Sequence, residues 1–131
     1  MNLRSRKLVR TIQIIFGILL IYFPLSGLIS ALQFLPPPQY NEAATAFLTA
    51  MFATGYLVYF ISIVFMIAGL MFIFNKWSAF GAILLAPINA NILLFHLFLD
   101  FTGFWFALVI ILLNVYLLAV HWPRYKLMFS R

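Results

Sequence analysis

The chain has 131 residues, of which 66% are hydrophobic and 8% charged, and its 8 Lys and Arg residues outnumber its 2 acidic residues. This composition leaves too little polar surface to cover a water-soluble domain, and the lack of cysteine excludes disulfides and thiol redox chemistry. The net charge of +6 does not indicate nucleic-acid binding, because the cations flank apolar stretches instead of forming a basic patch.

Charged residues divide the chain into long apolar stretches. Lys, Arg, Asp and Glu are all absent from residues 11–41, 43–75, 77–99 and 101–123. A bilayer core about 30 Å thick is crossed by roughly 20 helical residues, so each stretch holds one crossing and a fifth does not fit. The sequence therefore predicts an all-α membrane protein: an antiparallel four-transmembrane-helix bundle in a single domain over residues 1–131.

The first predicted transmembrane helix covers residues 9–35 and ends at the proline run 36–38. A short helix over residues 41–54, lying in the outer leaflet between helices 1 and 2, is predicted next. Asn41 is a suitable N-cap, and Glu42 places an acidic side chain in the first turn. The same residues also suit the first turns of a long, tilted second helix, since the glycine that follows them weakens a helix without forcing a break.

The second transmembrane helix is predicted over residues 55–74. Gly55, Ser62 and Gly69 recur every seven residues and therefore share one face, which predicts a seam where a neighbouring helix approaches closely. In the alternative, Tyr56, Tyr59 and Ser62 line a cavity. We favour the packing seam because small residues are typical of helix contacts in membranes.

The last two transmembrane helices are predicted over residues 77–99 and 103–122, and their short connection makes them antiparallel neighbours. In this four-span arrangement all 8 Lys and Arg residues lie on one side of the membrane and both acidic residues on the other. The positive-inside rule then predicts that both termini and the turn at 75–77 are cytoplasmic.

The third helix holds the densest polar pattern within the apolar stretches. At about 100° per residue, Asn89, His96 and Asp100 lie within about 20° of one line, which is about 16 Å long. Polar groups in hydrocarbon normally face the bundle interior or water, so this stripe is predicted to face inward. Asn91 is displaced from Asn89 by about 160° and needs a separate partner; the candidates are backbone carbonyls near Pro87, Asn114 and Ser62.

Two interpretations of His96 stay open. In the first, the imidazole is oriented beside an outward-facing cavity and hydrogen-bonds a carbonyl, a quinone oxygen or a lipid head group. In the second, it forms a structural hydrogen bond between helices, and Asp100 is a residue of the turn at the end of the span. No metal site is predicted, because two histidines at opposite ends of the bilayer with one carboxylate nearby do not supply enough ligands.

The segment 55–100 resembles the DoxX-like small membrane proteins. Their third helix carries the motif P-x-x-x-N-x-x-x-F-H-x-F, which is matched by Pro87, Asn91, Phe95, His96 and Phe98. The upstream proline-rich turn and ATGY segment, residues 36–56, resemble the family too, and the resemblance implies a four-helix bundle in the inner membrane of a bacterium. Family members are associated with quinone-linked redox assemblies or, in distant relatives, with assembly or receptor roles. Ser62 and Phe65 stand where the second helix of the family often carries Lys and Glu, which argues against redox catalysis.

The leading hypothesis is a non-catalytic membrane protein that binds a hydrophobic ligand, lipid or quinone-like, or a partner membrane protein, through the polar face of its third helix. No cofactor is predicted beyond a bound lipid or quinone. The expected partners are membrane lipids and a membrane protein or second copy of the chain. The alternative is a membrane subunit of a quinone-linked oxidoreductase complex. The candidate binding residues are Asn89, Asn91, His96, Asp100, Tyr59 and Ser62.

Overall fold

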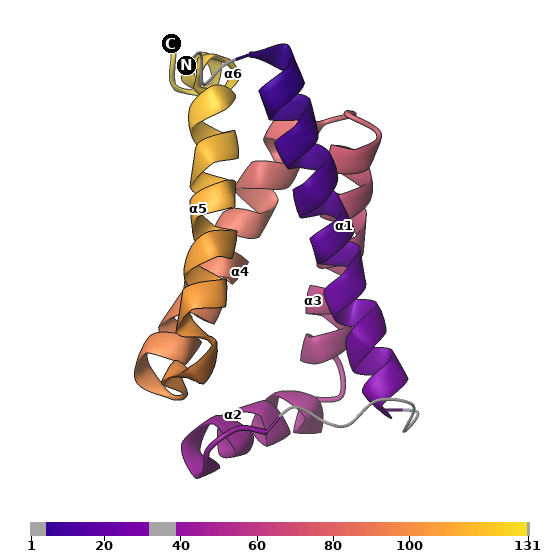
Figure 1. The fold of residues 1–131 in the computed structure, drawn as a ribbon, viewed down its shortest axis with the longest axis vertical. Helices are drawn as coiled ribbons and strands as arrows, with labels where there is room; N and C mark the ends of the chain where they lie inside the picture. Colours follow the sequence, from indigo (N-terminus) through magenta and orange to yellow (C-terminus); the bar gives the residue numbers. More distant parts are fainter. Residues whose placement is uncertain (1–4, 32–38, 131) are drawn as a thin grey trace.

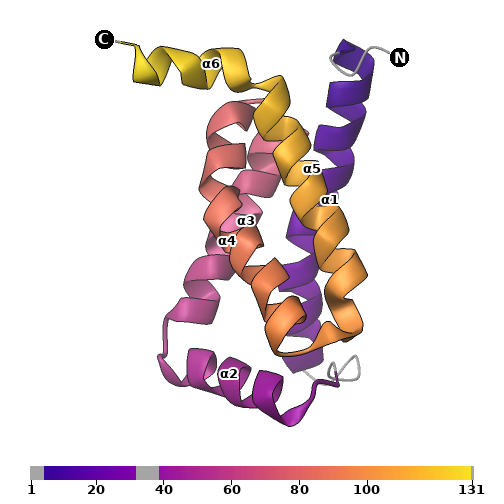
Figure 2. The same ribbon diagram turned by 90° about the vertical axis from the view of Figure 1, so that its left-hand side faces the viewer.

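The computed structural model describes residues 5–31 and 39–130, and in these residues it is all-helical. The elements in chain order are α1 Arg6–Ala31, α2 Glu42–Ala53, α3 Leu57–Ile73, α4 Ser78–Phe98, the 3₁₀ turn η1 Phe101–Gly103, α5 Phe104–Val120, α6 Trp122–Lys126 and the 3₁₀ turn η2 Leu127–Phe129. The long helices α1, α3, α4 and α5 run up and down beside one another, and the shorter helix α2 lies across one end of them (Figures 1 and 2).

The predicted ranges match these helices within a few residues where both are described. The first helix begins three residues earlier than predicted, at Arg6. Its predicted end at residue 35 and the proline run 36–38 lie outside the described residues. The fourth helix, predicted over residues 103–122, ends at Val120, and the short helix α6 then turns away from it (Figure 2).

The segment before α3 is a separate helix. The axes of α2 and α3 differ by 89°, and Gly55 in the turn between them has φ +78°, a backbone conformation that glycine adopts without steric cost. The side chain of Asn41 accepts a hydrogen bond from the Ala44 amide at 2.9 Å, so the predicted N-cap is confirmed. Of the two alternatives for residues 41–54, the structure has the short separate helix.

Helix α1 packs closely against α3 through two glycines. A Cβ atom on Gly17 would lie 2.7 Å from the Gly69 carbonyl oxygen, and one on Gly69 would lie 2.8 Å from the Gly17 oxygen. The rings of Phe16 and Phe72 stack beside this crossing with centroids 5.4 Å apart. The buried core continues from there between α3, α4 and α5.

The predicted small-residue seam is therefore correct only at Gly69. Gly55 lies in the turn before α3, and nothing comes within 4 Å of the position of its missing Cβ. The Ser62 hydroxyl donates to the Val58 carbonyl of its own helix at 2.8 Å. A seven-residue repeat requires an unbroken helix, and the turn at residue 55 ends that regularity.

Arg10 stabilises the end of α3 that lies beside the start of α1. Its guanidinium donates to the Phe72 carbonyl at 2.8 Å and also to the Ile73 carbonyl. Both carbonyls belong to the last turn of α3, where positive charge is favourable; the Phe72 carbonyl also accepts from the Asn75 amide at 3.2 Å. The tight turn predicted at 75–77 follows directly, and Asn75 and Trp77 adopt positive φ angles there.

Three helical segments are long and apolar enough to cross a membrane: Arg6–Gly27, Ser78–Phe98 and Phe101–Val120. The bent pair α2 and α3 raises this number to four if it forms one span. The start of α1 and the end of α5 lie at the same end of the bundle, opposite α2 (Figure 1). The described residues thus contain three to four helices compatible with a multi-pass membrane protein.

Candidate functional site

A cavity of about 500 Å³ lies at the α2 end of the bundle, between α1, α4 and α5. Cavities of this size are typical of sites for small ligands. Its wall is mostly apolar, with contributions from Leu20, Phe23, Phe65, Ile92, Phe106 and Ile110. The polar side chains in the wall are those of Gln39, Tyr40, Asn89, His96 and Thr102.

Asn89 is the most deeply buried polar side chain of this wall, with 1% of its surface exposed. Its Nδ2 donates to Oδ1 of Asn114 on α5 at 3.2 Å, and Nδ2 of Asn114 donates to the Ala82 carbonyl at 3.0 Å. Oδ1 of Asn89 has no hydrogen-bond partner among residues 5–31 and 39–130. Because nearly all buried polar atoms in proteins have a partner, this oxygen is the first candidate in the wall for a hydrogen bond from a ligand or water.

His96 lies two helical turns beyond Asn89, toward the α2 end, and is partly buried. Its Nδ1 lies 3.1 Å from the Asp100 carbonyl oxygen. A carbonyl only accepts, so this bond places a proton on Nδ1. Gly103 leaves room for the ring, since a Cβ at that position would lie 2.5 Å from the imidazole Cε1. The imidazole is oriented by the backbone of Asp100 and not by its carboxylate.

The Asp100 carboxylate instead joins the end of α4 to the start of α2. Oδ2 accepts from the Asn41 amide at 2.9 Å, and Oδ1 accepts from the Thr102 amide at 3.0 Å and from the Thr102 hydroxyl. These hydrogen bonds from Thr102 and Asn41 lower the pKa of the Asp100 carboxyl. Asp100 is 6% exposed and is not part of the cavity wall, so its role here is to hold the turn and α2 in place.

Tyr40 directly precedes Asn41 in the chain and is part of the cavity wall. Its ring packs edge-on against Phe95 with centroids 5.8 Å apart. Burial, and to a lesser extent the nearby Asp100 charge, raises the pKa of its phenol, so the ring stays neutral. Gln39 and Tyr40 were not predicted as wall residues, because their place beside α4 depends on long-range contacts, those of Tyr40 with Phe95 and of Asn41 with Asp100.

The other predicted site residues are not brought to the cavity. Asn91 is exposed on the outer face of α4 and makes no side-chain hydrogen bond with the described residues. The expectation that it finds a partner inside the bundle is therefore wrong, and Asn114 pairs with Asn89 instead. Tyr59 is 64% exposed, and Ser62 bonds within α3. The residue that α3 contributes to the wall is Phe65.

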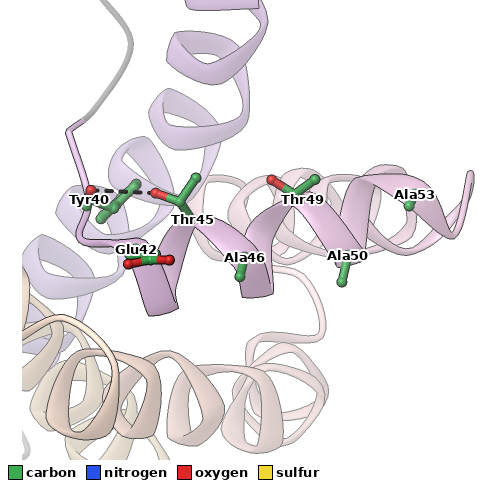
Figure 3. A pocket seen from close by; sticks show the side chains of 7 residues that line it. All are labelled: Tyr40, Glu42, Thr45, Ala46, Thr49, Ala50 and Ala53. Atoms are coloured by element: carbon green, nitrogen blue, oxygen red, sulfur yellow. Dashed lines mark hydrogen bonds between the residues drawn. The ribbon is translucent and has the colours of Figure 1, made fainter.

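A second hollow, of about 600 Å³, lies along α2 and is shown in Figure 3. Apart from Tyr40, all of its lining residues belong to this one helix: Glu42, Thr45, Ala46, Thr49, Ala50 and Ala53. None of them is buried. An open surface of small side chains gives a ligand few directed contacts, so we regard the cavity inside the bundle as the better candidate site.

No protein-family model, curated protein or solved structure matches the chain. The similarity to DoxX-like proteins stays a prediction that rests on the motif in α4.

Proposed function

We propose that this chain is a non-catalytic membrane protein of the DoxX-like type that binds a hydrophobic ligand with a polar head in the cavity between α1, α4 and α5. The observation that supports it most directly is the unpartnered Oδ1 of Asn89 in the wall of a mostly apolar cavity of about 500 Å³. An apolar wall with a few placed polar groups is typical of ligand sites. The polar face of α4, through Asn89 and His96, provides those groups.

We further propose that four helices cross the membrane, with α2 on the outer surface. Helix α3 has 17 residues and spans about 26 Å at 1.5 Å per residue, close to the thickness of the hydrocarbon core. The 89° bend keeps α2 out of the same straight span. In this arrangement α1 begins and α5 ends on the cytoplasmic side of a bacterial inner membrane, which agrees with the distribution of Lys and Arg.

Reporter fusions test this topology. A reporter fused after Arg131 or inserted at Lys76 should behave as cytoplasmic, and one inserted at Gln39 as external, because the bias in Lys and Arg between the two sides is 8 to 0. Alkaline phosphatase and green fluorescent protein report the two sides with opposite signals. Fluorescent protein that is active at Gln39 would contradict the orientation.

Ligand binding is tested by filling the cavity. The Ala107→Leu change adds a larger side chain to the wall, where Ala107 is 2% exposed. The protein extracted from its membrane in polymer nanodiscs should carry a hydrophobic species, detected by native mass spectrometry. We expect Ala107→Leu to lose most of this species, because the added methylenes occupy the ligand's space.

The matched control is Val109→Leu, which enlarges a side chain of the same helix on its outer face, where Val109 is 51% exposed. This variant should keep the species at wild-type occupancy. If Ala107→Leu folds poorly, His96→Gln provides the second test, since it changes the wall while keeping hydrogen-bonding capacity. Equal occupancy in the wild type, Ala107→Leu and His96→Gln would refute the proposed site.

A further inference from the structure

The direction of the hydrogen bonds around the cavity restricts the ligand's head group. The Ala82 carbonyl can only accept, so the Asn114 amide must turn its NH₂ toward it. Asn114 then presents Oδ1 to Asn89, and Asn89 must donate through Nδ2. This chain of two bonds fixes the Asn89 amide and uses one N–H of its Nδ2, while Oδ1, an acceptor, has no partner among the described residues.

His96 also has a hydrogen-bond acceptor. Its Nδ1 donates to the Asp100 carbonyl, so in the neutral imidazole the other nitrogen, Nε2, is an acceptor. The polar groups of α4 in the cavity wall, Asn89 and His96, thus both offer acceptors to a ligand. Gln39 and the partly exposed Tyr40 also carry donors in the wall, but water competes for them.

We propose that the ligand is a hydrophobic molecule whose head group donates a hydrogen bond, such as a long-chain or isoprenoid alcohol or a quinol, and not one whose head offers only carbonyl or ether oxygens. This inference rests on the proposed function and specifies its substrate class. A ligand hydroxyl that donates to the Asn89 Oδ1 gives both the hydroxyl proton and the amide oxygen a hydrogen-bond partner. A carbonyl or ether there leaves two acceptors facing each other in a site with little water, which is unfavourable for both.

Three probes that differ only in the head group test the inference: farnesol, farnesal and farnesyl methyl ether. The alcohol both donates and accepts, whereas the aldehyde and the ether only accept. Isothermal titration of the protein in nanodiscs should give farnesol an affinity about tenfold higher than the other two, the scale of one buried hydrogen bond. Affinities are compared after subtracting partition into empty nanodiscs.

Asn114→Leu provides the decisive variant because it acts on the orientation of Asn89 without changing Asn89. With its partner gone, the Asn89 amide is free to rotate and offer either its oxygen or its NH₂. The preference for farnesol over farnesal should therefore fall to about twofold or less. His96→Gln, whose side-chain amide also both donates and accepts, should weaken the preference as well and serves if Asn114→Leu does not fold. Asn91→Leu, at an exposed position of α4, should leave it at about tenfold.

The outcomes separate the two proposals. If none of the three probes binds, the proposed function itself fails. If all three bind wild-type protein equally, the cavity binds hydrophobic ligands but the donor requirement is wrong. If the alcohol is preferred to the same degree in wild type, Asn114→Leu and His96→Gln, the assignment of the selectivity to Asn89 and His96 is overturned.

Discussion

Gly69→Ala and Gly17→Ala should each destabilise the protein by about 1–3 kcal/mol, the scale of overpacking in a closely packed interior. In both cases the new methyl group meets a backbone carbonyl oxygen of the facing helix, at 2.8 Å and 2.7 Å respectively. A backbone atom moves only if the helix moves, so α1 and α3 must separate. That separation weakens the stacking of Phe16 on Phe72 beside the crossing.

Gly27→Ala is the matched control in the same helix. No atom of the described residues lies within 4 Å of the position of its missing Cβ, so the methyl group meets none of them. Alanine is the better helix former by roughly 0.5–1 kcal/mol, and this variant should therefore be neutral or more stable. Thermal unfolding in detergent measures the change in stability of Gly17→Ala, Gly69→Ala and Gly27→Ala. A Gly69→Ala protein as stable as Gly27→Ala would show that the two helices do not meet at these glycines.

The span ends could be predicted from the sequence because charges and turn residues mark them directly. Uncharged stretches of sufficient length fix the apolar helices, and the turn around Lys76 is required by the spacing of the charges. The direct contact between Gly17 and Gly69 could not be predicted. It depends on which face of α1 meets α3, and the hydrophobic pattern carries little of that information because these helices are apolar all round.

The candidate site could be predicted in part. The helical period places Asn89, His96 and Asp100 on one face, and the structure has Asn89 and His96 in the cavity wall. The period also separates Asn91 from Asn89, but it does not say whether a neighbouring helix covers the second face, and α4 leaves Asn91 exposed. The role of Asp100 depends on Asn41, which is 59 positions away in the chain, and no local pattern predicts that pair.

Asp100→Asn should release α2 from the end of the bundle. The carboxylate accepts hydrogen bonds from the amides of Asn41 and Thr102 and from the Thr102 hydroxyl, and bonds to an ionised acceptor are roughly twice as strong as neutral ones. Asparagine keeps one carbonyl oxygen and replaces the other with an NH₂ group that cannot accept. Hydrogen–deuterium exchange should therefore rise across α2, while α4 and α5 keep their protection.

The same carboxylate should make stability depend on pH in acid. These hydrogen bonds lower the pKa of folded Asp100 from its ordinary value of 3.8. A lowered pKa means that the stabilisation is fully present above the unfolded value and is lost as the pH falls through the folded one. The sequence has only two side-chain carboxylates, Asp100 and Glu42, so few groups contribute to a transition in this range.

The melting temperature of the wild type should thus be steady from pH 7 to about pH 5 and fall below pH 4, and Asp100→Asn should remove most of that fall. Glu42→Gln is the control, because Glu42 is an exposed residue of the first turn of α2 that forms no part of the joint, and it should keep the acid transition. If Asp100→Asn loses melting temperature in acid as steeply as the wild type, the Asp100 carboxylate is not what holds α2. Other contacts would then have to hold Gln39 and Tyr40 in the cavity wall.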